Sequence, residues 1–307
     1  MRFSPVAFVF ILWVFSLNLT AQQPTGNWPG FRGYRAQGTA QANIKMPQSW
    51  SVPDNKNIKW RVPIPGLAHS SPIVWGDRVF ITTAINSKGK SELKLGLYGN
   101  IAPVKNPPAH SWWIYCLDRQ TGKVMWKHKC HDGIPQVKRH TKATHANSTP
   151  TTDGKYFVAF FGSEGLFCLD MEGKQIWARN FGLLDSGFFR VPRAQWGFAS
   201  SPTIHEDKVI IQCDVQKNSF IAALDLKTGK TLWRTARTEV PTWSTPTVYV
   251  GSEQTQVIVN GFKHIGGYDL ETGKEVWQLS GGGDIPVPTP VIGYQLIFIT
   301  NAHGPGS

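Results

Sequence analysis

The chain has 307 residues, of which 41% are hydrophobic and 12% aromatic, and it contains 13 Trp, 30 Gly and 21 Pro. A disordered chain would lack so many aromatic side chains, and this mixture suits a globular protein of many short strands and tight turns. The formal net charge is +12. Its densest patch is residues 127–145, where a basic loop would attract anionic polymers or lipid surfaces.

The N-terminus has the features of an export signal. Arg2 precedes an apolar run from Val6 to Leu17, which is too short to span a bilayer. We therefore interpret residues 1–21 as a signal peptide that is cleaved after Ala21, with an uncleaved anchor as the alternative because Leu19 suits the cleavage site poorly. Export predicts a periplasmic or extracellular protein with no stable transmembrane helix after cleavage, and it argues against nucleic-acid binding.

One short pattern occurs four times, and LDLKTGKTLW from Leu224 to Trp233 is its clearest copy. Each copy has an Asp, then a Gly-Lys pair, then a Trp four residues after the Gly. The Asp can accept hydrogen bonds from turn amides and the Gly supplies a positive φ, so each copy predicts a hairpin. We expect each Trp to fill the gap between neighbouring units rather than to bind a ligand. The repeated residues are Asp118, Gly122, Trp126, Asp170, Gly173, Trp177, Asp225, Gly229, Trp233, Asp269, Gly273 and Trp277.

A second pattern, Ser or Thr followed by Pro, begins an apolar strand in each unit, where a missing N–H does little harm. Its copies begin at Ser71, Thr149, Ser201, Thr245 and Thr289. Together the patterns predict an all-β fold, a β-propeller of four-stranded antiparallel blades. The blades are expected at about 70–128, 147–179, 200–235 and 243–279, with a partial blade at 287–307.

About four and a half such blades cannot close a ring, so we expect an incomplete propeller, a fragment of a longer one. Residues 22–69 are predicted to be an N-terminal extension. Its strand around Trp60 has the character of an outer strand that would complete the closing blade.

Two segments depart from the repeat. Residues 85–111 separate two strands of the first blade and are predicted to be an insertion loop. Residues 127–145 hold five Lys or Arg and four His, and we interpret them as a solvated loop between blades. A metal site at His128, Cys130 and His131 is a weaker alternative, because the spacing matches no standard zinc pattern.

The four cysteines do not form a recognisable framework. Cys116 and Cys168 hold the same repeat position, directly before Leu-Asp, and are expected to be buried thiols. A bridge between Cys130 and Cys213 stays open in an oxidising compartment.

The segment AALDLKTGKTLW, Ala222 to Trp233, resembles the repeat of pyrroloquinoline-quinone-type, or quinoprotein, propellers. NWPGFRG, Asn27 to Gly33, and the stretch 57–82 are similar to the opening of secreted quinoprotein-repeat proteins of planctomycete-type bacteria. The resemblance implies a quinoprotein alcohol dehydrogenase-like fold. It does not fix the function, because the superfamily holds dehydrogenases and, more distantly, an outer-membrane assembly factor that acts as a scaffold.

The resemblance places the first strand of each repeat nearest the axis, so the residues just before each Ser/Thr-Pro should surround the mouth of the channel. These residues are His69, His145, Trp196, Trp243 and Asp284. Two interpretations stay open, a cup that binds a ligand by stacking and hydrogen bonding, and side chains that fill a narrow channel.

A quinone-dependent dehydrogenase, as the resemblance implies, needs Ca²⁺ held by oxygen ligands, an Asp base and a Trp floor under the quinone. Trp196 or Trp243 could serve as the floor, but the Glu, Asn and Asp ligands and the adjacent Cys pair of those enzymes have no match. The sequence therefore predicts a scaffold that binds a protein partner or a small ligand at one face, with no catalytic residues, metal or cofactor. The alternative is an alcohol or sugar dehydrogenase that depends on pyrroloquinoline quinone and calcium.

Overall fold

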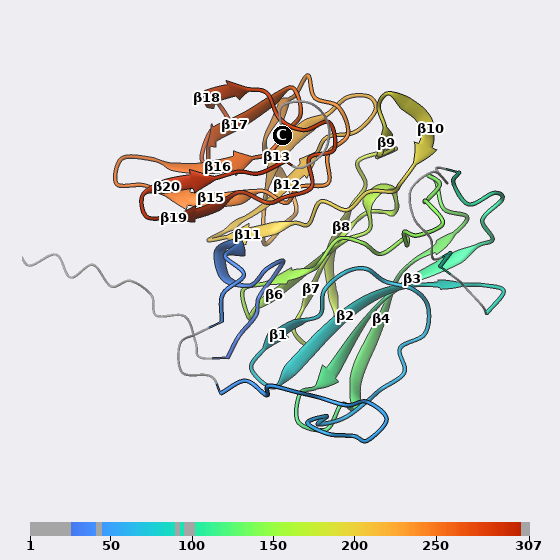
Figure 1. Ribbon diagram of the computed structural model, residues 1–307. Helices are drawn as coiled ribbons and strands as arrows, with labels where there is room; N and C mark the ends of the chain where they lie inside the picture. Colours follow the sequence, from blue (N-terminus) through green and yellow to red (C-terminus); the bar gives the residue numbers. More distant parts are fainter. Residues whose placement is uncertain (1–25, 41–44, 90–92, 95–101, 302–307) are drawn as a thin grey trace, which may run out of the picture.

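The computed structural model describes residues 26–40, 45–89, 93–94 and 102–301, so the predicted signal peptide and its cleavage site lie outside the described residues. The all-β class and the propeller architecture are confirmed, since the described chain forms four four-stranded antiparallel sheets, each in sequential strand order. Figure 1 shows these blades following one another along an arc. No described helix is long and apolar enough to cross a membrane.

The strands of each blade follow the predicted hairpins. The first blade contains β1 (Ile73–Trp75), β2 (Arg78–Asn86), β3 (His110–Asp118) and β4 (Val124–Gly133). The second contains β5 (Thr151–Thr152), β6 (Tyr156–Phe160), β7 (Leu166–Asp170) and β8 (Gln175–Arg179). The third contains β11 (Thr203–His205), β12 (Lys208–Cys213), β13 (Phe220–Asp225) and β14 (Thr231–Ala236). The fourth contains β15 (Thr247–Val250), β16 (Thr255–Val259), β17 (His264–Asp269) and β18 (Glu275–Ser280).

Four smaller elements complete the described chain. Hairpin β9 (Gly187–Phe188) and β10 (Val191–Gln195) lies between the second and third blades, and hairpin β19 (Val291–Gly293) and β20 (Leu296–Phe298) follows the fourth. The 3-10 helices are η1 (Tyr34–Ala36) and η2 (Gly162–Glu164).

Each repeat Asp organises its turn, and three of the four repeat Trp residues reach the next blade. In the third blade, the Asp225 carboxylate accepts hydrogen bonds from the amide and hydroxyl of Thr228 (2.7 and 2.6 Å). The Trp177 indole packs directly on Gly229, because a Cβ at Gly229 would lie only 2.7 Å from Trp177 Cδ2. Trp177 Nε1 donates a hydrogen bond to the Leu226 carbonyl (2.9 Å). Gly229 has φ 68°, so it supplies both the turn conformation and the flat surface under the ring.

The same arrangement recurs along the arc. Trp126 packs on Gly173 and Trp233 packs on Gly273. Trp60 packs on Gly122 in the same way, with its Nε1 donating to the Arg119 carbonyl (2.9 Å). Trp277 instead turns back to its own blade, because its Nε1 donates to Gln256 of β16 (2.8 Å).

The hydroxyls of the Ser/Thr-Pro pattern link the inner strands around the axis. The Ser71 amide donates to Thr149 Oγ1 (2.9 Å) and the Thr149 amide to Ser201 Oγ (2.9 Å). The Ser201 amide continues to Thr245 Oγ1 (3.1 Å), and the Thr245 amide to Thr289 Oγ1 (3.4 Å). The Ser or Thr therefore joins blades, while the Pro begins the strand.

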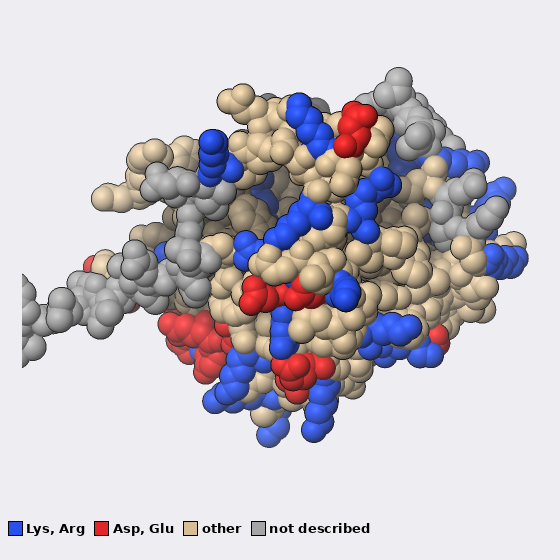
Figure 2. Space-filling view, turned by 90° about the horizontal axis from the view of Figure 1, so that it is seen from below, with Lys and Arg blue, Asp and Glu red and all other residues tan. Residues whose placement is uncertain are grey.

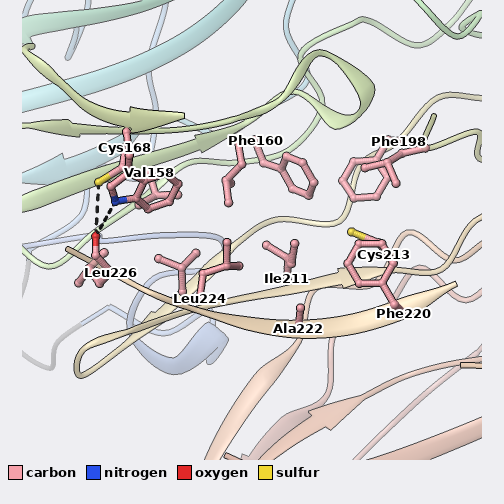
Figure 3. Packing of buried hydrophobic residues seen from close by; sticks show 14 of the residues in the cluster. Val158, Phe160, Cys168, Phe198, Ile211, Cys213, Phe220, Ala222, Leu224 and Leu226 are labelled. Atoms are coloured by element: carbon pink, nitrogen blue, oxygen red, sulfur yellow. Dashed lines mark hydrogen bonds between the residues drawn. The ribbon is translucent and has the colours of Figure 1, made fainter. Parts of the chain in front are cut away.

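Hydrophobic clusters fill the spaces between blades. Figure 3 shows the cluster between the second and third blades, where Cys168, Leu226 and Ile211 pack together. Burial raises the pKa of the Cys116 and Cys168 thiols to about 12. The Cys130–Cys213 bridge left open by the sequence does not form, because all four cysteines are free.

The basic segment 127–145 is only in part a loop, which corrects the interpretation from the sequence. Residues up to Gly133 belong to β4, where Lys127 and Lys129 point to solvent while His128 and Cys130 are half-buried. This alternation has the period of a strand. Figure 2 shows Lys and Arg spread over the visible face with smaller groups of Asp and Glu between them, rather than in one patch.

Candidate functional site

The predicted rim residues lie in the segments that lead into β1, β5, β11, β15 and β19, and we call the side of the arc where these inner strands begin the upper face. The His69 amide donates to the Ala146 carbonyl (3.0 Å), which joins the rims of the first two blades. Trp196 and Trp243 are neighbours, with ring centroids 5.3 Å apart and planes at 37°. Trp243 Nε1 donates to the Gly197 carbonyl (2.8 Å), which fixes its ring.

His145 is half-buried beside another imidazole that the sequence analysis missed. Its ring meets His110 edge to face, with centroids 4.9 Å apart. Burial, followed by the charges of His110 and Arg139, lowers the pKa of His145 to about 3. Its Nε2 has no hydrogen-bond partner among the described residues. The ring is therefore neutral at physiological pH.

The charge of Arg139 acts on both imidazoles, and Arg139 is buried, with 7% of its surface exposed. The solvated-loop interpretation is therefore wrong for this residue. Its Nη1 donates to the carbonyls of His140 (3.1 Å) and Ala143 (2.6 Å). No carboxylate of the described residues forms an ion pair with it. Burial, with a smaller contribution from the Arg139 charge, also lowers the pKa of His69.

Hairpin β9–β10 adds aromatic and charged groups to the tryptophan pair. Phe188 stacks on Trp196 with centroids 5.9 Å apart and planes at 7°. Arg190 Nε lies 3.3 Å from the buried carboxylate of Asp284. Asp284 therefore serves as an ion-pair partner of the hairpin. The only sequence signal for this hairpin is that the connection between the second and third blades is longer than a turn.

Another buried acid, Glu164, lies near His145. Burial raises the pKa of Glu164 to about 7, although its Oε1 accepts the Gln136 amide (3.0 Å). A cavity of about 10 Å³ lies between Glu164, His145 and Asn147. That volume is about the size needed for one water molecule, so this space is too small for a ligand.

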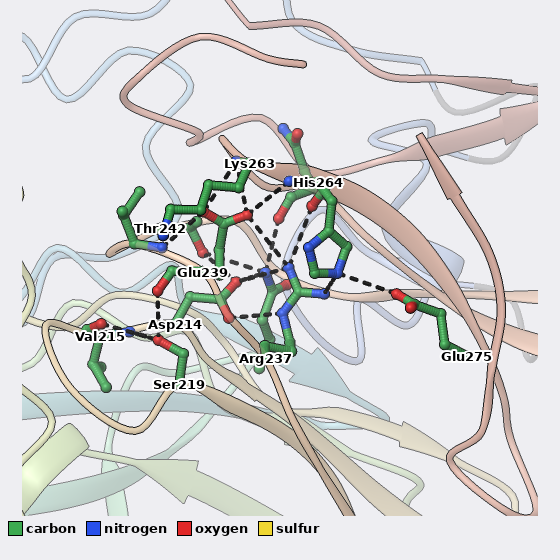
Figure 4. Close-up of polar contacts among 12 residues, drawn as sticks. Asp214, Val215, Ser219, Arg237, Glu239, Thr242, Lys263, His264 and Glu275 are labelled. Atoms are coloured by element: carbon green, nitrogen blue, oxygen red, sulfur yellow. Dashed lines mark hydrogen bonds and ion pairs between the residues drawn. The ribbon is translucent and has the colours of Figure 1, made fainter. Parts of the chain in front are cut away.

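A buried polar network supports the loop that carries Trp243, as Figure 4 shows. Arg237 and Asp214, both fully buried, form an ion pair of 2.8 Å. Thr242, directly before Trp243, donates its hydroxyl to the same carboxylate (3.1 Å). Removing one member of a buried ion pair leaves an uncompensated charge in the interior, which is strongly destabilising. We therefore expect this network to hold the loop that carries Trp243 in place.

The acidic side chains of the upper face have partners within the protein. Among the described residues, no three His, Cys, Asp or Glu side chains lie close enough to hold a metal ion. The Asp284 carboxylate is paired with Arg190, and Glu164 is held by a backbone amide. Nor do His128, Cys130 and His131 converge, since the His131 ring lies against Trp112.

The fold defines the class as a quinoprotein-like propeller. Residues 111–300 match the family described as outer membrane protein assembly factor BamB, built from pyrroloquinoline-quinone-type repeats. Because this match covers more than half of the chain, the protein belongs to that family.

Known relatives share the fold at low identity. Polyvinylalcohol dehydrogenase from a Pseudomonas species is 24% identical over 199 residues, which are 59% of this chain and 25% of that protein. A europium-containing methanol dehydrogenase is similar in structure, with a TM-score of 0.53 and 11% identity over 84% of this chain and 49% of that one. Quinohemoprotein alcohol dehydrogenase from Comamonas testosteroni is similar in structure with a TM-score of 0.51 and 15% identity, and the match covers 86% of this chain and 43% of that one. The chain thus spans less than half the length of these relatives.

Proposed function

We propose that this protein is a periplasmic or extracellular propeller that binds a protein partner or small ligand at its upper face and has no redox chemistry of its own. The observation that supports this most is the rim itself. The stacked rings of Phe188 and Trp196 and the adjoining ring of Trp243 lie on the same face as uncharged imidazoles and the buried cation Arg139. Aromatic rings with a few fixed polar groups are typical of recognition surfaces.

The rim offers little for acid–base chemistry. His145, with a pKa near 3, is a weak base at neutral pH. The Asp284 carboxylate is held by Arg190. An envelope location is supported by the export signal and by the outer-membrane role in the description of the family.

Capture from an envelope extract tests the binding role. We would compare the unmodified protein with Trp243→Ala and with Trp50→Ala, a control whose side chain is 69% exposed on the N-terminal extension. We expect the same captured partner with the unmodified protein and Trp50→Ala, and its loss with Trp243→Ala. Equal capture by all three proteins would place the binding surface elsewhere.

The second candidate is a dehydrogenase that depends on pyrroloquinoline quinone. The Trp196–Trp243 pair supports it, because a flat cofactor could stack on either ring. Equilibrium dialysis with the quinone and Ca²⁺ distinguishes the two. Stoichiometric uptake that is lost in Trp243→Ala and kept in Trp50→Ala would favour the dehydrogenase.

A further inference from the structure

A second cavity lies along the inner strands, away from the rim residues, at what we call the lower face. Its volume is about 460 Å³, within the range of small-molecule sites. One wall is the N-terminal segment 29–36, and the other comes from the inner strands β5, β11 and β15 with Trp75. No rim residue lines it, so it is separate from the site described above.

The N-terminal wall is a fixed part of the fold. Trp28 and Val74 exchange two backbone hydrogen bonds (2.7 and 2.9 Å), which adds this segment to the inner edge of β1. The Thr152 amide donates to the Pro29 carbonyl (2.9 Å), which fastens the segment to β5. In Figure 1 the blue segment lies inside the arc, close to β11.

The backbone of this wall is strained. Arg32, Arg35 and Ala36 all have left-handed conformations, with φ of 58°, 50° and 56°. This conformation is strained for residues other than Gly. Such strain persists only where the surrounding structure holds it, and it clusters at ligand sites. Here it places Arg35 in the wall of the cavity.

The rest of the lining is mainly apolar. Phe31, Ile204 and Val248 contribute hydrophobic surface. The hydroxyls of Thr203 and Thr247 already donate to backbone carbonyls of the next units (3.0 and 2.7 Å). These walls therefore favour contact with an apolar body over hydrogen bonding.

Arg35 is the cation that a ligand can use. No carboxylate of the described residues forms an ion pair with it, and its charge lies 5.2 Å from the ring of Tyr34. Two acids also line the cavity. Asp153 accepts two amides of its own turn (2.8 and 2.7 Å), and the Glu206 side chain is 72% exposed, 3.9 Å from His205. Burial lowers the pKa of His205, so this ring is neutral at pH 7.

We propose that the lower cavity binds a small amphipathic carboxylate, with its apolar or aromatic body inside the cavity and its carboxylate on Arg35. A guanidinium suits this role because it can donate two parallel hydrogen bonds to a carboxylate.

Isothermal titration with naphthalene-2-carboxylate tests this proposal, with naphthalene-2-methanol as the uncharged analogue. Arg35 and Arg61 are both exposed, but only Arg35 lines the cavity, so Arg61→Ala is the matched control. We expect binding that is at least tenfold weaker in Arg35→Ala, unchanged in Arg61→Ala and weaker for the alcohol.

Absence of binding, equal affinity in the two arginine variants, or equal affinity for the alcohol would overturn the proposal. Trp243→Ala should leave this binding unchanged, so the result is independent of the function proposed for the upper face. Equal melting temperatures of the variants would show that each protein is folded.

Discussion

Replacement of Trp233 by Ala should destabilise the protein strongly. Only 8% of the surface of Trp233 is exposed. It packs on Gly273, and its Nε1 donates to the Leu270 carbonyl (2.8 Å). Truncating a buried Trp costs about 3–5 kcal/mol, from lost apolar contact and the cavity left behind. Leaving the Leu270 carbonyl unpaired contributes to that loss.

Urea unfolding followed by circular dichroism measures this loss, because the midpoint falls with stability when the slope is unchanged. Lys230→Ala, on the exposed turn of the same hairpin, should stay within about 0.5 kcal/mol. Trp277→Ala should cost less than Trp233→Ala, since Trp277 is only half-buried and donates within its own blade. Equal midpoint shifts for Trp233→Ala and Lys230→Ala would refute the role of the Trp contacts between blades.

Four further results are expected. Trp60→Ala should lower the unfolding midpoint more than Lys59→Ala does, because Trp60 packs on Gly122 as the repeat Trp residues pack on their neighbours. The raised pKa of Glu164 contributes stability that is fully present below pH 4.5 and lost as the pH rises through about 7. Glu164→Gln should remove this loss, on the order of 3 kcal/mol, in unfolding curves at pH 4.5 and 8. Peptide mass mapping should find no disulfide at Cys130. N-terminal sequencing of exported protein should begin at Gln22, and an intact Met1 would contradict cleavage.

The sequence predicted the blades because the turns that build them are local. An Asp, a Gly and a Trp within a few residues specify a hairpin, and five Ser/Thr-Pro steps specify the first strands. The sequence did not show that the Trp of one blade lies on the Gly of the next, although the two share a spacing. That contact depends on how blades pack, which local turn chemistry does not determine.

The candidate site was predictable only in part. The positions before each Ser/Thr-Pro pointed to the rim, including Trp196 and Trp243. Arg139 was missed because a run of basic residues usually faces solvent, whereas here local carbonyls accept its hydrogen bonds. Hairpin β9–β10 was missed because its strands are short and irregular in register. The lower cavity joins the N-terminus to three later blades, a contact that no local pattern records.

The most direct test of the proposed function is turnover. The purified protein would be incubated with pyrroloquinoline quinone and Ca²⁺, and dye-linked oxidation of methanol, ethanol, polyvinyl alcohol and glucose would be followed by absorbance. A binding propeller without redox chemistry predicts dye reduction no faster than in the protein-free mixture. Saturable dye reduction that disappears in Trp243→Ala and persists in Trp50→Ala would contradict it.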